Sequence, residues 1–390
     1  MRKIIITSYP YVYERYFKVF DLFKDKARLF FILPSNWQAK RKGRYIPVPI
    51  RHDIRIVATK AYFWHSHYPI IGGLFKGMMP GIDRILKSHS HPGDVLFTVN
   101  EPNHLSVLYN AVLAKRFGLK HVIYSDQNVP YRQRLAGLKL LFVEWIVRKN
   151  LSLADRVVCS NQKARKVLSK YTSSTDKFVQ IPETGVDTTL FHPGTTGSWR
   201  AEYGLQNKIV FAFAGMLEAR KGIMEVLAAF SAVRRQIPDV ALLFIGFGPE
   251  QFRAQVYVSE HGLKDAVIFI DFVSNEELSE LFSAIDVFVC YSLPFQGWEE
   301  QLGYSMRESL AAGIPVISTR TGSIEEIVVD GKNGILVEPF DHQALVAAMV
   351  RLAGDGQMRS EMSRAAREYA MEFFSYEVIA SRLESFFDSL

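Results

Sequence analysis

The stretch Trp298-Glu-Glu-Gln-Leu-Gly-Tyr-Ser-Met-Arg-Glu308 indicates most directly how its half of the chain is folded. It is followed by Ser309–Gly313 and by the apolar run Ile314–Ser318. The first part contains a glycine and predicts a loop. The next part begins with polar residues and predicts a short helix, and the apolar run predicts a buried strand. The stretch therefore predicts one unit of an alternating α/β fold.

Glu300 and Glu308 stand near the two ends of this stretch. If Tyr304 opens the helix, Glu308 lies about one turn into it, and the amides around Gly303 and Tyr304 form a helix N-terminus that can bind phosphate. The two carboxylates would then accept hydrogen bonds from hydroxyl groups. The site suits a ligand with phosphate in its middle and a polyol on both sides, and a nucleotide sugar is such a ligand.

The composition is that of a soluble globular protein, with 48% hydrophobic and 22% charged residues, and 390 residues are enough for two domains. Cys159 and Cys290 each end an apolar run, so we expect buried, reduced thiols in a cytosolic protein. The apolar part of Met1–Thr7 is too short for a signal peptide and predicts a first strand. No apolar run reaches transmembrane length, since Leu135–Val147 is interrupted by charged residues.

Charge is divided unevenly along the chain. Residues 1–190 hold 31 Lys and Arg against 13 Asp and Glu, whereas residues 191–390 hold 16 against 27, although the whole chain has a net charge of +7. The basic half predicts an anionic partner, such as phospholipid head groups, a lipid pyrophosphate or nucleic acid. The alternative is that the charge serves contact between the domains and solubility.

In the first half, apolar runs alternate with amphipathic stretches, and Leu105–Phe117 and Arg132–Asn150 are predicted helices. Residues 39–93 fit this alternation least well and predict loops or short helices. The basic run Lys40–Arg44 and the aromatic segment Tyr62–Tyr68, with Phe63, Trp64 and Tyr68, are candidates for acceptor contacts or membrane docking, or else are ordinary surface loops. The predicted strands are Lys3–Thr7, Leu29–Leu33, Val95–Val99, His121–Ser125, Arg156–Ser160 and Phe178–Ile181.

A segment rich in Gly, Thr and Pro, Gly185–Gly197, predicts a domain boundary, after which the alternation begins again. We expect an N-terminal domain over 1–190, a C-terminal domain over 191–375 and a last helix, 376–390, that packs back on the first domain. Both domains are predicted to be Rossmann-like, doubly wound parallel sheets that face each other across a cleft. The predicted strands here are Ile209–Ala214, Val240–Ile245, Val267–Ile270, Val287–Val289, Val316–Thr319 and Gly334–Val337; the helices are Met224–Gln236, Glu250–His261, Glu276–Ala284, Tyr304–Ala312, Ile324–Val329, His342–Ala353, Ser360–Phe373 and Tyr376–Leu390.

Three strand-to-helix loops of the second half are candidates for ligand contact. Gly215–Gly222 contains glycines, which let the backbone approach a ligand closely. It also contains the cations Arg220 and Lys221 beside the helix start, and diphosphate binding requires both features. Gly246 opens a second glycine turn, for which tight packing is an equal alternative. The backbone around Val273, in the third loop, is exposed enough to contact a base edge.

In the first half, Glu101 and Asp126 each follow a predicted parallel strand, and Asn128 lies two residues further on. Polar groups at the carboxyl ends of neighbouring parallel strands meet at one edge of the sheet, so these are acceptor-side candidates. Helix capping is the alternative. The histidines are scattered and no Cys or third ligand completes a set, so we predict no metal site.

Taken together, Gly215–Gly222, the Glu300–Glu308 pair, Ala311–Val316 and Thr321–Gly334 are similar in order to the motifs of retaining GT-B glycosyltransferases of the family-four type, or glycosyltransferase group 1. The second half resembles that family along nearly its whole length. The resemblance implies transfer of a sugar from a nucleotide diphosphate to a saccharide or lipid-linked glycan, with retention of configuration and without a required metal or other cofactor. It implies a role in surface polysaccharide or glycolipid synthesis.

The resemblance also implies roles for individual residues. Glu308 would bind the ribose, Glu300 the hydroxyls of the transferred sugar, and Lys221 with Arg220 the diphosphate, by charge stabilisation. Asp126 is the catalytic candidate of the first half. The resemblance implies donor contacts for the amides near Leu302, Gly303 and Tyr304. Further candidates for donor contact are Gly215, Met216, Gly246, Val273 and Ser305, and Glu101 and Asn128 are the candidates for acceptor contact.

Several positions depart from the family pattern. Met216 stands where the family usually has arginine, so either Arg220 compensates or donor binding is weaker. Glu183 replaces a frequent asparagine, and no histidine follows Tyr124 where one is usual, although Asp126 lies nearby. These departures concern the acceptor more than the fold.

Two other readings remain open. One is a GT-B nucleotide-sugar epimerase or hydrolase; the other is a non-catalytic protein that binds a sugar nucleotide or nucleic acid. The pI of about 9.2 favours nucleic acid, but no recognition motif supports it, so we expect no nucleic-acid partner. We expect a cytoplasmic protein that contacts the anionic inner membrane surface, and the sequence indicates no oligomeric state.

Overall fold

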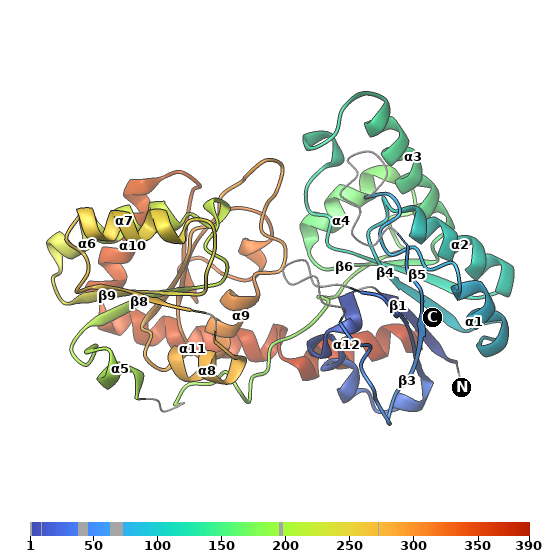
Figure 1. Ribbon diagram of the computed structural model, residues 1–390, viewed down its shortest axis with the longest axis horizontal. Helices are drawn as coiled ribbons and strands as arrows, with labels where there is room; N and C mark the ends of the chain where they lie inside the picture. Colours follow the sequence, from blue (N-terminus) through green and yellow to red (C-terminus); the bar gives the residue numbers. More distant parts are fainter. Residues whose placement is uncertain (1, 9, 38–45, 63–72, 195–197, 272) are drawn as a thin grey trace. The chain divides into compact units, whose positions relative to one another are not determined.

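The computed structural model describes residues 2–8, 10–37, 46–62, 73–194, 198–271 and 273–390. The chain forms two compact units, of which the first comprises Met1–Thr184 with Ile379–Leu390 and the second Gly185–Val378. The sequence predicted a division at residue 190. Each unit contains one parallel sheet with its own core (Figure 1).

The first unit is built on a seven-stranded parallel sheet in the order β3-β2-β1-β4-β5-β6-β7. Its central strands are buried along their whole length, because helices and turns cover both faces of a parallel sheet. The strands are β1 (Ile4–Ser8), β2 (Leu29–Pro34), β3 (Arg55–Thr59), β4 (Val95–Val99), β5 (Lys120–Ser125), β6 (Arg156–Cys159) and β7 (Phe178–Gln180), and the helices are α1 (Ile82–His89), α2 (Leu105–Phe117), α3 (Gly137–Leu153) and α4 (Gln162–Leu168).

Strand β3 and helix α1 lie in the region where the sequence predicted only loops or short helices. Among the strands of the described residues, β3 lies at the edge of the sheet and pairs with β2 alone, with Phe30 opposite Arg55 in their register. All its residues are at least partly exposed, so it lacks the apolar run by which the central strands were predicted. Most of Lys40–Arg44 and Tyr62–Tyr68, including Phe63, Trp64 and Tyr68, lies outside the described residues.

The second unit is built on a six-stranded parallel sheet in the order β10-β9-β8-β11-β12-β13. The predicted strands of this half are confirmed to within one residue. They are β8 (Ile209–Ala214), β9 (Val240–Ile245), β10 (Val267–Ile270), β11 (Val287–Cys290), β12 (Val316–Thr319) and β13 (Gly334–Val337), and the helices are α5 (Trp199–Glu202), α6 (Ile223–Gln236), α7 (Gln251–Glu260), α8 (Asn275–Phe282), α9 (Tyr304–Ala311), α10 (His342–Gly354) and α11 (Gly356–Phe373).

The predicted helix Ile324–Val329 is wrong. Only a single 3-10 turn forms, over Ile324–Glu326. The side chain of Asn333 then stabilises the following residues, because it accepts a hydrogen bond from the amide of Val329 at 2.7 Å and donates one to the carbonyl of Ile327 at 3.2 Å. The apolar residues Ile324, Ile327 and Val328 are buried in the core of the second unit, so the segment has the apolar pattern of a helix without forming one.

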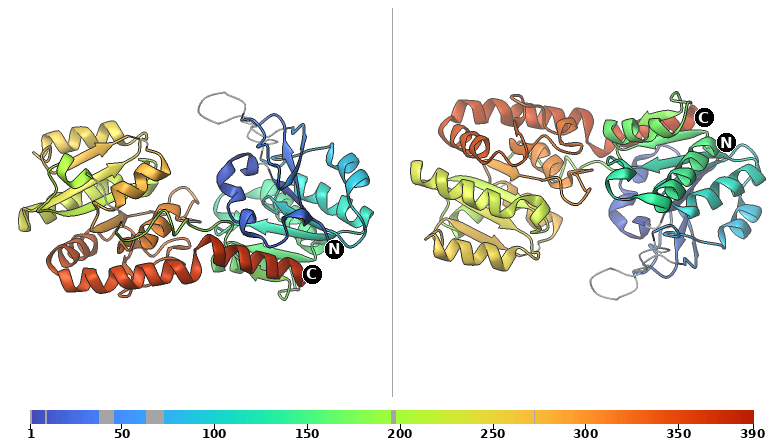
Figure 2. Two further views of the ribbon diagram at one scale, coloured as in Figure 1. Left: turned by 90° about the horizontal axis from the view of Figure 1, so that it is seen from below. Right: turned by 90° about the horizontal axis from the view of Figure 1, so that it is seen from above.

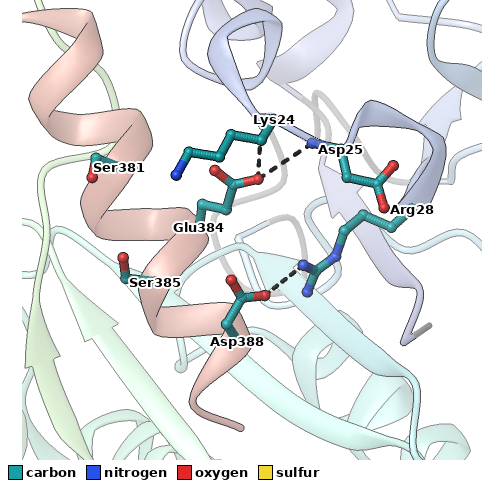
Figure 3. Close-up of a pocket in the computed structure, with 7 residues that line it drawn as sticks. All are labelled: Lys24, Asp25, Arg28, Ser381, Glu384, Ser385 and Asp388. Atoms are coloured by element: carbon teal, nitrogen blue, oxygen red, sulfur yellow. Dashed lines mark hydrogen bonds and ion pairs between the residues drawn. The ribbon is translucent and has the colours of Figure 1, made fainter.

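The last helix, α12 (Tyr376–Asp388), belongs from Ile379 onward to the first unit, as the sequence predicted (Figure 2). Glu384 on this helix is 8% exposed and accepts a hydrogen bond from the backbone amide of Lys24 at 3.0 Å. Arg28 pairs with Asp388 (Figure 3). The ring of Phe387 lies 5.3 Å from that of Phe97 on β4. Apolar packing and polar contacts together hold the helix on this unit.

These polar contacts line a pocket of about 440 Å³ between α12 and the segment Lys24–Arg28. Arg28 immediately precedes β2, so the pocket lies toward the amino end of that strand. Ligands of open α/β sheets bind at the carboxyl ends of the strands. Acidic and basic groups line it together, and we assign it no ligand.

Candidate active site

The second sheet changes the direction of its strand order between β8 and β11. The loop that leaves β8 begins at Gly215, and the loop that leaves β11 begins at Tyr291. Loops at such a point separate toward opposite faces of the sheet and leave a crevice in which ligands bind. The residues that the sequence singled out in this half lie largely on these two loops.

Lys221 and Glu300 meet at this point, although 79 positions separate them in the chain. Lys221 Nζ donates a hydrogen bond to Glu300 Oε2, and Ser292 Oγ donates to the same oxygen at 3.0 Å. The Glu300 residue is 6% exposed, and the Lys221 side chain is 16% exposed. The structure thus joins two of the predicted catalytic candidates in one buried ion pair.

Electrostatics keep both groups of this pair charged. Burial alone would raise the pKa of Glu300, but the charge and the hydrogen bond of Lys221, with help from Ser292, lower it below its usual value. Burial likewise opposes the charge of Lys221, and Glu300 nevertheless raises the pKa of the ammonium group. A cation and a carboxylate therefore coexist at the end of β11.

Close backbone packing fixes the loop that carries Lys221. Gly222 has φ +65°, and a Cβ there would lie 2.3 Å from the carbonyl oxygen of Tyr291. The amide of Leu293 donates to the carbonyl of Arg220 at 2.9 Å. The loop after β8 is thus attached directly to the loop after β11, which explains why Lys221 reaches Glu300.

Arg220 is oriented by the aromatic ring of Trp298. Its guanidinium carbon lies 3.8 Å from the ring centroid, Lys221 Nζ lies 5.2 Å from the same centroid, and Arg220 Nε donates to Glu218. The guanidinium group of Arg220 and the ring of Trp298 therefore lie beside the ion pair. Trp298 was not predicted as a site residue, although its position at the start of the stretch that contains Glu300 was a usable indication.

The loop around Glu300 is also held by the turn after β12. The amide of Ser323 donates to the carbonyl of Glu300 at 2.9 Å, and the amide of Gly322 donates to a carboxylate oxygen of Glu299 at 3.1 Å. Gly322 has φ +59°, and a Cβ there would lie 2.0 Å from the carbonyl oxygen of Glu300. The sequence did not predict Gly322 and Ser323 as supporting residues, because nothing local relates them to Glu300.

Helix α9 begins at Tyr304, as predicted, after Gly303 in the left-handed conformation. Gly303 has φ +52°, which favours glycine, whereas a Cβ there would meet Ile327 Cδ1 and Met306 Cε at 2.6 Å, the ends of flexible side chains that can shift. The first turn of the helix closes from the amide of Arg307 to the carbonyl of Gly303 at 3.1 Å. The amides of Tyr304 and Ser305 precede the first hydrogen bond of the helix and point toward its N-terminus. Glu308 lies on the second turn and is half-buried.

The other predicted donor residues lie along the neighbouring strand ends. Gly215 is exposed and Met216 is half-buried, directly after β8. A Cβ at Gly246 would lie 2.1 Å from the carbonyl oxygen of Gly215, so this glycine is required for packing, the alternative that the sequence left open. Val273 lies half-buried beyond the edge strand β10. Leu302 is half-buried just before Gly303.

Glu101 and Asp126 come together in the first unit, at the carboxyl ends of β4 and β5. Glu101 accepts from Ser125 Oγ at 2.5 Å and from the amide of Asp126 at 2.9 Å. Burial, together with the adjacent charge of Asp126, raises the pKa of Glu101 well above its usual value. Asn128 lies buried on the same loop. The capping alternative is wrong, since helices α2 and α3 have His104 and Ala136 at their N-caps.

Glu183 is a further acidic residue of this region that the sequence did not predict as a site residue. Burial raises its pKa to about 8, and the charge of Asp126 contributes. The same two carboxylates raise the pKa of Tyr16, after burial as the main cause. Three carboxyl groups from separate loops therefore influence one another in this unit, and at least one of them holds a proton near neutral pH.

The remaining expectations concern the two cysteines, metal binding and membrane-spanning helices. Cys159 and Cys290 are buried and free. Within the described ranges, no group of three or more His, Cys, Asp or Glu side chains is placed to hold a metal ion, and no helix is long and apolar enough to cross a membrane.

Comparison with known proteins identifies the family. The family model described as glycosyl transferases group 1 matches residues 196–369. The chain is 32% identical over 275 residues to the GDP-mannose-dependent alpha-(1-6)-phosphatidylinositol monomannoside mannosyltransferase of Mycolicibacterium smegmatis, a match that covers 70% of this chain and 71% of that protein. It is 30% identical over 251 residues to spore coat protein SA of Bacillus subtilis, covering 61% of this chain but only 65% of that protein.

The fold is shared with solved structures over the whole chain. The crystal structure of HepE from Anabaena in complex with UDP matches with a TM-score of 0.77 at 18% identity and covers 100% of both chains. The chain thus belongs to the glycosyl transferases group 1 and has their GT-B fold of two Rossmann-like domains. It is a glycosyltransferase.

Proposed function

We propose that this glycosyltransferase transfers a sugar from a nucleotide diphosphate to a saccharide or lipid-linked glycan, with retention of configuration and without a required metal. The observation that carries the proposal is the buried Lys221–Glu300 pair, which Ser292 supports at the strand switch of the second sheet. A cation and a hydroxyl-binding carboxylate stand there side by side. A nucleotide diphosphate sugar needs both.

The donor is proposed to bind to the second unit. Lys221 and Arg220 neutralise the diphosphate, and the amides of Gly303, Tyr304 and Ser305 at the start of α9 bind its oxygens. Glu308 accepts hydrogen bonds from the ribose, and Glu300 from hydroxyls of the transferred sugar. Cations and amides that are already positioned stabilise the leaving nucleoside diphosphate as its bond to the sugar breaks, and such stabilisation is the main catalytic effect we invoke.

The acceptor is proposed to bind to the first unit, at the carboxyl ends of β4 and β5. Asp126 accepts a hydrogen bond from the attacking hydroxyl, while Glu101 and Asn128 hold neighbouring hydroxyls. The raised pKa of Glu101 favours its protonated form, which can donate as well as accept a hydrogen bond. Neutral polyhydroxyl groups are therefore a better match here than a strongly acidic group.

We propose a cytoplasmic protein that works at the inner membrane surface, in surface polysaccharide or glycolipid synthesis. The excess of basic residues in 1–190 supports contact with an anionic surface. A lipid-linked acceptor is supported by the similarity to the M. smegmatis phosphatidylinositol monomannoside mannosyltransferase.

A thermal-shift screen of UDP-, GDP- and ADP-sugars tests the donor assignment, because a true donor stabilises the folded protein by mass action. The donor that binds is then incubated with and without acceptor. We expect turnover that requires an acceptor, persists in a chelator and gives a product with the anomeric configuration of the donor. Equal turnover without any acceptor would instead support the hydrolase or epimerase reading.

A variant with a matched control tests the role of Glu308. Glu308→Gln removes the charge that binds ribose hydroxyls and should weaken donor binding or turnover by at least about tenfold, since hydrogen bonds to charged groups contribute about 1.5–3 kcal/mol. Glu260→Gln, an exposed glutamate on α7, makes the same substitution outside the site and should leave both unchanged. Equal donor binding and turnover in the two variants would reject the assignment.

A further inference from the structure

Helix α3 has an exposed apolar face in addition to its buried one. Val143, Ile146, Val147 and Leu151 are buried in the core of the first unit. A second apolar set occupies the outward face, namely Leu138 (85% exposed), Leu141 (63%), Phe142 (45%) and Trp145 (52%). We call these four residues the α3 stripe. Their spacing of three, four and seven positions places them on one side of the helix.

The α3 stripe is more than scattered surface hydrophobicity. Single exposed apolar residues are common on soluble proteins, but neighbouring large ones indicate an interaction surface. The rings of Phe142 and Trp145 stack, with centroids 6.0 Å apart and an interplanar angle of 14°. Two stacked rings and two leucines on adjacent turns form one continuous apolar surface, and Figure 1 shows α3 on the outside of its unit.

Basic side chains surround this surface. Arg132 and Arg134 precede the helix, Lys139 lies beside the first leucine, and Arg148 and Lys149 follow the stripe, all of them exposed. The acidic residue of the helix, Glu144, is engaged by Arg148 at 3.2 Å and by the Tyr171 hydroxyl at 3.2 Å. The α3 stripe is therefore an apolar surface bordered by cationic side chains.

An anionic lipid surface fits this combination better than other occupants. Leucine, phenylalanine and tryptophan insert at the boundary of head groups and acyl chains, while Lys and Arg contact the phosphates. A second copy of the chain would bring two cationic borders together, which like-charge repulsion disfavours. The excess of basic residues over 1–190 acts in the same direction.

The position of the stripe connects it to the acceptor side. Helix α3 follows the loop that leaves β5, the loop of Asp126 and Asn128, so its first turns lie toward the carboxyl ends of the strands. The α3 stripe occupies the first half of the helix. A membrane bound there would lie on the side of the unit where we place the acceptor.

We propose that the α3 stripe with its basic border docks the protein on an anionic phospholipid surface. The inference rests on the proposed function only in that the acceptor is lipid-linked. The aromatic segment Tyr62–Tyr68, the docking candidate expected from the sequence, lies mostly outside the described residues and stays a prediction.

Co-sedimentation of the full chain with vesicles tests the proposal. We expect binding to vesicles that contain phosphatidylglycerol, little binding to pure phosphatidylcholine, and weaker binding as salt rises. The double variant Phe142→Ser/Trp145→Ser should bind the anionic vesicles at least about tenfold less tightly, because it removes two rings from the inserted face. Phe252→Ser is the control, since Phe252 is a single aromatic residue of the second unit that is 77% exposed.

Three outcomes would overturn the proposal. The first is that the wild-type protein does not sediment with anionic vesicles, the second is that the double variant binds as tightly as the control, and the third is that the wild type forms a dimer, lost in the double variant, without any vesicle binding. Thermal stabilisation by the nucleotide-sugar donor is measured in parallel without vesicles and should be equal in all variants. Its absence from the wild type would count against the proposed function and not against docking.

Discussion

Lys221 and Glu300 illustrate what a buried ion pair demands of its surroundings. Each charge loses water on burial, and the opposite charge of its partner offsets this loss, with Ser292 as a further donor to Glu300. Neither group can be removed alone without leaving an uncompensated charge in a site where hydration is poor. The pair is thus both a structural element and the candidate donor site, and a change in stability has to be separated from a change in binding.

Removing Lys221 alone should therefore destabilise the second unit. We expect Lys221→Met to lower the free energy of unfolding by about 3–5 kcal/mol, because Glu300 stays buried without its cation. The double variant Lys221→Met/Glu300→Gln should recover most of this loss while failing to bind the donor. Urea denaturation of the wild type, of the single variants Lys221→Met and Glu300→Gln and of the double variant gives the coupling energy, and additive losses would contradict a direct interaction.

Gly322 supports Glu300 through its lack of a side chain. Gly322→Ala places a methyl group against the carbonyl of Glu300, whereas Gly331→Ala, at φ +73°, meets nothing within 4 Å. Both variants should lose about 1–2 kcal/mol from left-handed strain. Only Gly322→Ala should also reduce stabilisation by the donor in a thermal-shift assay, because the loop has to move. Equal donor response in both variants would show that the loop position is unimportant.

Helix α12 shows how one element is anchored by polar contacts of unequal value. Glu384 is buried and accepts from the amides of Lys24 at 3.0 Å and Asp25 at 3.5 Å, whereas Asp388 is exposed and pairs with Arg28 at the surface. A buried acceptor matters more than an exposed ion pair, since water replaces the partner of the latter.

Glu384→Ala should release the helix and Asp388→Asn should not. We expect about 1–3 kcal/mol less protection of the α12 amides in Glu384→Ala and at most about 1 kcal/mol in Asp388→Asn. Hydrogen exchange of the intact protein, followed over Ile379–Leu383, measures both. Similar losses in the two variants would indicate that apolar packing through Phe387 anchors the helix.

At the scale of the whole molecule, the two units should respond differently to pH. In the first unit, the folded state holds the Glu183 proton up to a pKa of about 8, while the unfolded chain releases it near 4.5. The folded unit thus binds more protons in this interval and loses stability as the pH rises through it. In the second unit, the lowered pKa of Glu300 means that the ion pair stabilises above about 4.5 and is lost as the pH falls.

Hydrogen exchange read separately in β4–β5 and in β8–β11 tests this difference. Between about pH 5 and pH 8, protection of the first unit should decline after correction for the intrinsic exchange rate, and that of the second should stay constant. Glu183→Gln should flatten the decline, while Glu14→Gln, an exposed glutamate of the same unit, should not. A decline that persists in Glu183→Gln would assign it to another group, with Glu101 the first to examine.

Continuous apolar runs and glycine loops in the sequence were enough to predict nearly all strands, the start of α9 and the return of the last helix to the first unit. These features are local, because the period of the pattern and the turn residues lie within a few positions of one another. Edge strand β3 escaped prediction for the same reason, since a partly exposed strand lacks such a run. The packing of the two halves into separate sheets follows from the repeated alternation.

Only the tertiary structure decided which distant residues meet. It brought Lys221 to Glu300, placed Gly322 and Ser323 behind Glu300, and made Glu183 sensitive to the charge of Asp126. It also decided which of the two apolar faces of α3 is buried, a choice that helical periodicity leaves open because both faces have the same spacing. Burial, and with it pKa and the exposed α3 stripe, depends on what packs against a residue, and the sequence around that residue does not contain this information.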